Sequence, residues 1–141
     1  MIEDRSDDRQ RLESELRVLT EVAKTLTSPL ELPELLEAVL HRMAQVLEPA
    51  EAGVIMLWDP SAGLFRAAAS MGFDRESLAR IGIRSGESIT GKVYDSGQAW
   101  LLENSEAVAR AMGNLRTANL SYLQQARRKD GLPQSCLAIP L

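Results

Sequence analysis

The chain has 141 residues, of which 45% are hydrophobic and 26% charged, and its formal net charge is -4. These values are typical of one globular domain and exclude a disulfide scaffold or a largely disordered chain. The acidic balance argues against binding nucleic acid through its phosphates, which needs clustered Lys and Arg. The single cysteine, Cys136, excludes an internal disulfide and favours a cytoplasmic location. No apolar run is long enough to cross a membrane, so we expect no membrane association.

The first predicted element is a helix within residues 1–31. Its apolar residues are spaced alternately by four and three positions: Leu12, Leu16, Leu19, Ala23, Leu26 and Leu30. This seam is typical of a coiled coil and predicts a dimerising helix. The alternative is an amphipathic helix that packs on its own domain, because fewer than three heptads do not separate the two readings.

Residues 32–141 form a second unit in which helices and strands are mixed. A helix over 32–47 has a wide apolar face suited to covering a sheet. Strands are predicted over 52–58 and 64–70 around the turn "DPSAG", and again over 98–104 and 135–141. Asp74 is the expected cap of a short helix, Gly97 ends another, and 105–130 is helical or irregular, with its clearest helix at 120–130. The order predicts an α+β fold with mostly antiparallel pairing.

The stretch "SGESITGKV", residues 85–93, nearly matches a phosphate-binding loop. Such a loop ends in Ser or Thr, and Val93 at that position offers no oxygen to a magnesium ion. The preceding "LARIGIRS" also lacks the continuous apolar run of a strand buried on both faces. We therefore interpret Gly86 and Gly91 as sites of tight turns, with Ser88 or Thr90 capping the following helix.

Four stretches in order resemble a GAF domain: "LELPELLEAVLHRMAQVL", "AGVIMLWDPSAGLFRAAASMGF", "IRSGESITGKVYDSGQAWLLEN" and "SCLAIPL". The similarity is greatest to GAF domains of bacterial sensor histidine kinases and of activators of the alternative sigma factor. It implies a GAF/PAS-like central antiparallel sheet flanked by helices, with a small-molecule pocket between the sheet and residues 73–122. Because a GAF sheet continues with a further strand and a closing helix, the resemblance implies that the domain is incomplete at its C-terminus. An exposed strand edge then invites a partner.

For an anionic ligand, the candidate counter-charges are Arg84, Lys92 and Arg116, helped by the helix start near Ser88. Their alternative role is that of solvated surface charges. Trp100 and Tyr122 are candidate pocket walls, although core packing explains them equally well.

The sequence offers no cofactor or catalytic centre. His41 is a lone imidazole without a second ligand in register. Leu137 follows Cys136, whereas tetrapyrrole-binding relatives carry His directly after Cys. We therefore expect no bilin, haem or metal, and a non-catalytic module, because no complete catalytic motif is present.

The resemblance implies a sensory domain of a bacterial signal-transduction protein. It would bind a small molecule of unknown identity and signal, as a homodimer, through its N-terminal helix to an output domain elsewhere in the parent chain. The alternative is a structural dimerisation module without a ligand.

Overall fold

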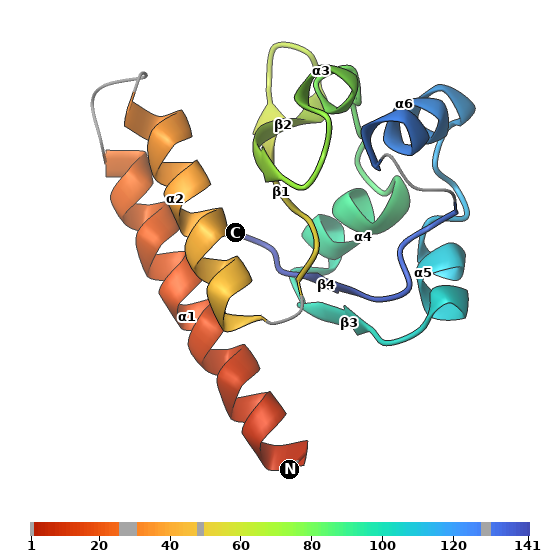
Figure 1. The fold of residues 1–141 in the computed structure, drawn as a ribbon. Helices are drawn as coiled ribbons and strands as arrows, with labels where there is room; N and C mark the ends of the chain where they lie inside the picture. Colours follow the sequence, from red (N-terminus) through yellow and green to blue (C-terminus); the bar gives the residue numbers. More distant parts are fainter. Residues whose placement is uncertain (1, 26–30, 48–49, 128–130) are drawn as a thin grey trace.

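The computed structural model describes residues 2–25, 31–47, 50–127 and 131–141, and the side chains of 2–5 and 22–25 are not described. Helices and strands are mixed along the chain, and the strands pair antiparallel, which confirms the α+β class. Two long helices lie side by side at one side of the molecule, and a β-hairpin with several short helices lies at the other (Figure 1).

The two long helices are α1, Ile2–Thr25, and α2, Glu31–Val46. The N-terminal turns of α1 project beyond the end of α2 (Figure 1). The seam residues Leu12 and Leu16 are only 3% and 5% exposed, because they pack against α2 within the same chain. A helix is therefore present over Ile2–Thr25 of the predicted range 1–31, and Leu12 and Leu16 pack on its own domain. Leu26 and Leu30 lie outside the described residues, as does the side chain of Ala23.

The hairpin consists of β1, Gly53–Asp59, and β2, Leu64–Met71. The predicted turn is present, but Asp59 still pairs with Leu64, so the loop is the four residues that follow Asp59. The Asp59 carboxylate accepts hydrogen bonds from the Ser61 N–H and hydroxyl and from the Ala62 N–H. An aspartate whose side chain accepts a hydrogen bond from the backbone two residues further on commonly forms a turn. This turn could therefore be predicted from the local sequence.

The hairpin separates two apolar clusters because successive strand residues point to opposite faces. Val54 and Met56 face one cluster, and Ile55 and Leu57 face the other. The α2-side cluster has as its buried members Leu16, Leu36, Val39, Leu40, Ile55 and Ala69. The α6-side cluster has as its buried members Phe65, Leu78, Ile81, Ile83 and Ala126. A register shift opposite Ile55 and Met56 leaves Ala68 as an extra residue, so Ala68 and Ala69 both pack toward α2.

The remaining elements are α3 (Arg75–Leu78), α4 (Ser88–Ser96), β3 (Trp100–Leu102), α5 (Ser105–Ala111), α6 (Thr117–Arg127) and β4 (Cys136–Ala138). Asp74 caps α3 by accepting from the Ser77 N–H, and Gly97 ends α4 with φ 65°, as the sequence predicted. Strands β3 and β4 pair antiparallel, so the described strands form two separate two-stranded ladders where one central sheet was expected. A single bridge between Phe65 and Ile83 adds the segment before α4 to the hairpin.

Within the described ranges, no helix combines the length and the apolar character needed to span a bilayer.

Candidate functional site

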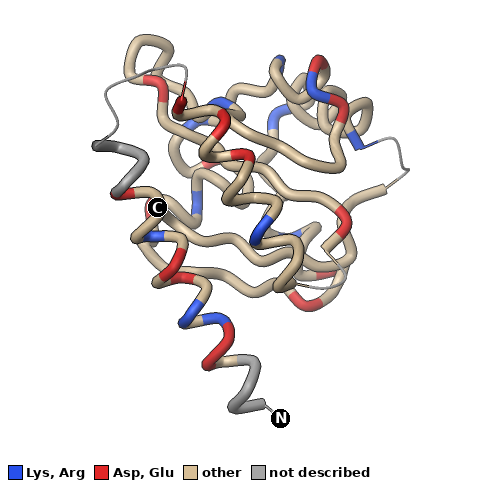
Figure 2. The backbone as a smooth tube through the Cα atoms, turned by 60° about the vertical axis from the view of Figure 1, so that its left-hand side comes forward, with Lys and Arg blue, Asp and Glu red and all other residues tan. Residues whose placement is uncertain are grey.

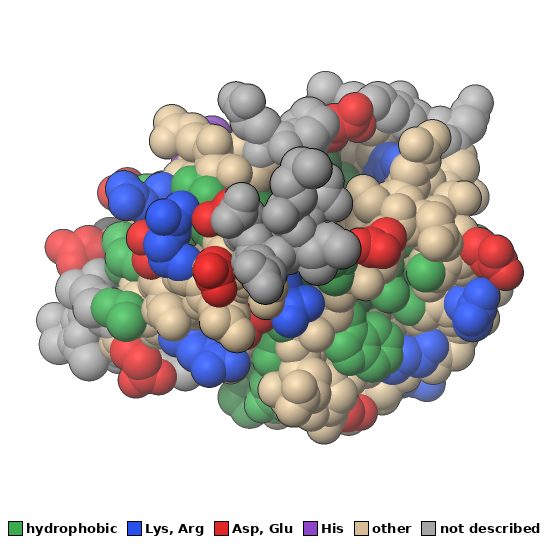
Figure 3. Space-filling view, turned by 90° about the horizontal axis from the view of Figure 1, so that it is seen from below, with side chains coloured by type: hydrophobic (Ala, Val, Ile, Leu, Met, Phe, Trp, Pro, Cys, Tyr) green, Lys and Arg blue, Asp and Glu red, His purple; other side chains and the backbone are tan. Residues whose placement is uncertain are grey.

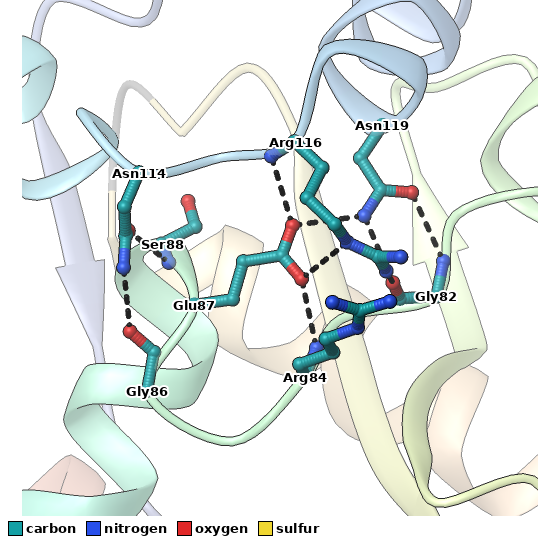
Figure 4. A network of polar contacts seen from close by, with 8 residues as sticks. All are labelled: Gly82, Arg84, Gly86, Glu87, Ser88, Asn114, Arg116 and Asn119. Atoms are coloured by element: carbon teal, nitrogen blue, oxygen red, sulfur yellow. Dashed lines mark hydrogen bonds and ion pairs between the residues drawn. The ribbon is translucent and has the colours of Figure 1, made fainter.

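The turn before α4 meets the start of α6 around one carboxylate (Figure 4). Glu87 Oε1 accepts hydrogen bonds from the Arg84 N–H at 2.9 Å and the Arg116 Nε–H at 3.0 Å. Its Oε2 accepts from the Arg116 N–H and the Asn119 Nδ2–H, each at 3.0 Å. Glu87 therefore joins two segments that are distant in sequence, and Arg116 is its ion-pair partner.

Glu87 is 5% exposed, although carboxylates are seldom buried without partners. Burial raises the pKa of Glu87, but the hydrogen bonds from Arg84, Arg116 and Asn119 together outweigh it, so the pKa lies below its usual value. The carboxylate is therefore ionised at neutral pH, and the Arg116 guanidinium balances its charge.

Asn119 and Arg116 also bind the backbone of Gly82 (Figure 4). Asn119 Oδ1 accepts from the Gly82 N–H at 3.3 Å, and its Nδ2 donates to the Gly82 oxygen at 2.8 Å. Arg116 Nη2 donates to the same oxygen. The first turns of α6 are thus attached to the chain between Gly82 and Glu87 by side chains that are buried or half-buried.

The first turn of α4 is held from a distant loop. The predicted caps, Ser88 and Thr90, are wrong: the N-cap position is Glu87, whose side chain makes no capping bond. Instead, Asn114 Oδ1 accepts from the Ser88 N–H at 2.8 Å, and Asn114 Nδ2 donates to the Gly86 oxygen at 2.9 Å. Ser88 has φ 54° and is the one non-glycine residue with positive φ in the described part of the chain. Asn114 therefore supplies the acceptor that a local cap normally provides.

Gly86 lies at a tight turn, as predicted, whereas Gly91 lies within α4, where the prediction of a turn is wrong and the backbone of Arg84 and Gly86 comes close. Gly86 has φ 74°, which favours glycine. A Cβ at Gly91 would lie 2.5 Å from the Arg84 oxygen, so only glycine fits there. Val93, at the position that would hold a hydroxyl in a phosphate loop, is buried.

The structure brings two of the five predicted ligand residues together at Glu87, which accepts from the backbone N–H of Arg84 and from the side chain of Arg116. Lys92 lies in α4, where its Nζ donates to the Ala111 oxygen of α5 at 2.7 Å. Trp100 is half-buried in β3, opposite Ala138, and Tyr122 packs against the α6-side cluster. Arg116 and Lys92 thus have partners within the chain, whereas the side chain of Arg84 is exposed. A ligand-binding role for all five stays a prediction.

The predicted pocket region, between the hairpin and residues 73–122, contains apolar side chains. Those packed on the buried members of the α6-side cluster are Val54, Met56, Ala67, Phe73, Leu115, Tyr122 and Leu123. A small cavity of about 70 Å³ is lined by Glu51, Ala52, Gly72, Phe73 and Arg127. Pockets for drug-sized ligands measure roughly 300–1,000 Å³, so this cavity takes only a few atoms as it stands.

Glu87, Asn114 and Asn119 were not predicted from the sequence as site residues. The three residues carry most of the polar contacts of the site, yet Glu87 occupies a variable position of the near phosphate loop, and the two asparagines belong to no motif or apolar period. The available signal was slight: a glutamate directly after Gly86, and two asparagines in the stretch "MGNLRTAN".

The structure also places His41 and Cys136, the two residues for which no metal or cofactor role was expected. His41 is exposed on α2, and Cys136 is half-buried in β4, where burial raises the pKa of its thiol. Across the described ranges, no three His, Cys, Asp or Glu side chains gather as a metal site would require.

No family model matches the chain. Among solved structures, it resembles the GAF domain of a phosphoenolpyruvate-protein phosphotransferase from Acinetobacter, with a TM-score of 0.58 and 17% identity over 99% of this chain and 70% of that one. It also resembles the corresponding GAF domain from Coxiella burnetii, with a TM-score of 0.51 and 20% identity over 74% of this chain and 58% of that one. The chain therefore has the fold of a GAF domain, as the sequence predicted.

The chain is also similar in sequence to two regulatory proteins. The chain is 32% identical over 90 residues, or 64% of its length, to the Nif-specific regulatory proteins of Azospirillum lipoferum and Azospirillum brasilense. It spans 14% of the length of these relatives.

Proposed function

We propose that this chain is the sensory domain of a cytoplasmic signal-transduction protein, and that it binds a small molecule without catalysing a reaction. The GAF fold supports this proposal, and so does the similarity to two regulatory proteins. The output domain would belong to the parent protein, and α1 would dimerise to pass on the signal.

The observation that carries the proposal is the construction of the α6-side region. An apolar cluster lies under α3 and α6, and the Glu87 network fixes the start of α6 over it. Apolar lining with a few polar groups nearby is typical of small-molecule sites. A ligand would enter by displacing partly buried side chains such as Tyr122 and Leu123, because the region is filled without it.

The composition of this region also indicates the kind of ligand. Arg116 and Lys92 are already engaged by a carboxylate and a carbonyl oxygen, so an anion would have to compete for them. Arg84, at the rim of the network, is the predicted cation whose side chain is exposed. We therefore propose a mainly apolar ligand that carries no more than one anionic group, placed toward Arg84.

Thermal unfolding with a panel of metabolites and nucleotides tests the proposal. A ligand that binds the folded chain raises the melting temperature, and the stabilisation grows with the logarithm of its concentration relative to its dissociation constant. Each hit is then titrated by calorimetry into the wild type, into Tyr122→Ala and into Val18→Ala, whose side chain is exposed on the far helix α1. Weaker binding only in Tyr122→Ala is expected, whereas no hit in the whole panel would favour the alternative, a structural module without a ligand.

A further inference from the structure

The helix seam that was predicted to dimerise is covered within a single chain. Leu12 and Leu16 are buried, and they line a narrow groove with Val39 and Met43 of α2. Leu19 packs against the α2-side cluster. A dimer that leaves α1 in its present place cannot use these residues.

The outer surface of α1 offers little to a partner. Its exposed described residues are Ser6, Asp7, Asp8, Gln10, Arg11, Ser14, Arg17, Val18 and Glu21. Acidic and basic residues follow one another along the helix (Figure 2). At the end of the molecule from which α1 projects, hydrophobic side chains form separate patches among charged ones (Figure 3). Among the side chains of α1 that the structure describes, Val18, 62% exposed, is the single large apolar one that is exposed, whereas stable interfaces have an apolar centre.

The attachment of α1 to the domain depends mainly on α2. Helix α1 lies on the side of α2 that faces away from the hairpin (Figure 1), and α2 is the element on which it packs. The ion pair between Glu15 and Arg42, at 3.9 Å, joins two partly exposed side chains and adds little. Helix α1 can therefore leave its place without opening the α6-side cluster, whose members all come from β1 and beyond.

We propose that α1 exchanges between two equivalent places, its own α2 and the α2 of a second copy. In the monomer and in the exchanged dimer, the groove beside Val39 and Met43 is filled by an α1 helix of the same sequence, so the contacts seen within one chain can form again between two copies. Exchange of an identical element is a low-cost route to a dimer, since no new interface has to be built. The inference rests on the proposed function, because it gives a structural route for a dimer formed through α1.

Cross-linking between two distinguishable copies tests the exchange. Both copies carry Cys136→Ser and different tags; one has Leu16→Cys and the other Val39→Cys, two positions that line the same groove. After mixing at high micromolar concentration and mild oxidation, exchange predicts a covalent heterodimer. The control replaces Leu16→Cys by Val18→Cys, which lies on the exposed side of α1 and should form little heterodimer. If Leu16→Cys does not fold, as judged by thermal unfolding, the pair Leu19→Cys and Met43→Cys in the same groove replaces it.

Light scattering on the unmodified chain separates this inference from the proposed function. A monomer at every concentration overturns both the exchange and the proposed dimer. A dimer without the Leu16–Val39 heterodimer, or with equal cross-linking from Val18, overturns the exchange alone, because the chains would then meet through another surface. A dimer with the groove cross-link and a weak Val18 signal supports both.

Discussion

At the scale of the residue, Glu87 has the largest structural role in the candidate site. Its two oxygens accept four hydrogen bonds, one from the turn before α4, two from Arg116 just before α6 and one from Asn119 in α6. Hydrogen bonds to charged groups contribute about 1.5–3 kcal/mol each, and unpaired buried partners add a penalty when the carboxylate is removed. Arg116 is therefore a structural partner of Glu87 first, and any contact with a ligand would come at the expense of this pair.

Replacement of Glu87 by Gln should destabilise the folded chain. The amide keeps the shape but loses the charge opposite Arg116, so we expect the free energy of unfolding to fall by about 2 kcal/mol. Urea unfolding followed by circular dichroism measures this change in the free energy of unfolding. The matched control is Glu106→Gln, because Glu106 is 83% exposed in its pair with Arg110 and should contribute less than about 0.5 kcal/mol. Equal effects of the two substitutions would show that the Glu87 network is not stabilising.

The stability of the chain should depend on pH through the same residue. Because the pKa of Glu87 is lowered in the folded state, its contribution is complete above the usual value of 4.5 and is lost as the pH falls through the folded pKa. Asp59 also has a lowered pKa, mainly through its bond from Ser61, so Glu87→Gln should remove only part of the acid sensitivity. Urea unfolding at a series of pH values below 6 tests this. If the free energy of unfolding of Glu87→Gln depended on pH as steeply as that of the wild type, Glu87 would not be a source of the acid sensitivity.

At the scale of the element, α4 shows how far local sequence predicts a helix. Its end was predicted because Gly97 in the left-handed region is a local signal. Its beginning was not, because Asn114, which binds the Ser88 N–H, lies 26 residues away in the sequence. Asn119 and Gly82 are 37 residues apart. Turns at Asp59 and Asp74 depend on neighbours and could be predicted, whereas the Glu87 network depends on the tertiary fold and could not.

Gly91 gives a sharp test of the turn that begins α4. A methyl group there would meet the Arg84 oxygen and the Gly86 nitrogen at 2.5 and 2.7 Å, so Gly91→Ala should lower the free energy of unfolding by about 2–3 kcal/mol. Gly97→Ala is the control, because no atom lies within 4 Å and only its φ opposes a side chain, at a cost of about 1 kcal/mol. Denaturant unfolding of both variants compares the two effects. A smaller loss at Gly91 than at Gly97 would mean that the close backbone approach is absent.

At the scale of the whole molecule, the hairpin lies between two apolar clusters with different neighbours. The long helices cover the α2-side cluster, and α3 and α6 cover the other. The sequence predicted the two helices, the hairpin and the GAF fold, because each has a strong local pattern or an ordered set of stretches. It left open whether the seam of α1 would pair with a second copy or pack on its own domain, because a heptad pattern does not specify which surface it will meet.

The proposed ligand region lies beside α6, and the proposed signalling helix, α1, lies on the opposite side of the hairpin. Hydrogen exchange measured by mass spectrometry tests the link between them most directly, using the first panel compound that raises the melting temperature. We predict slower exchange in β1, β2 and α6 when the compound is bound, together with a change in α1 and α2. Protection confined to α1 and α2, or slower exchange near α6 with α1 unchanged, would contradict the account.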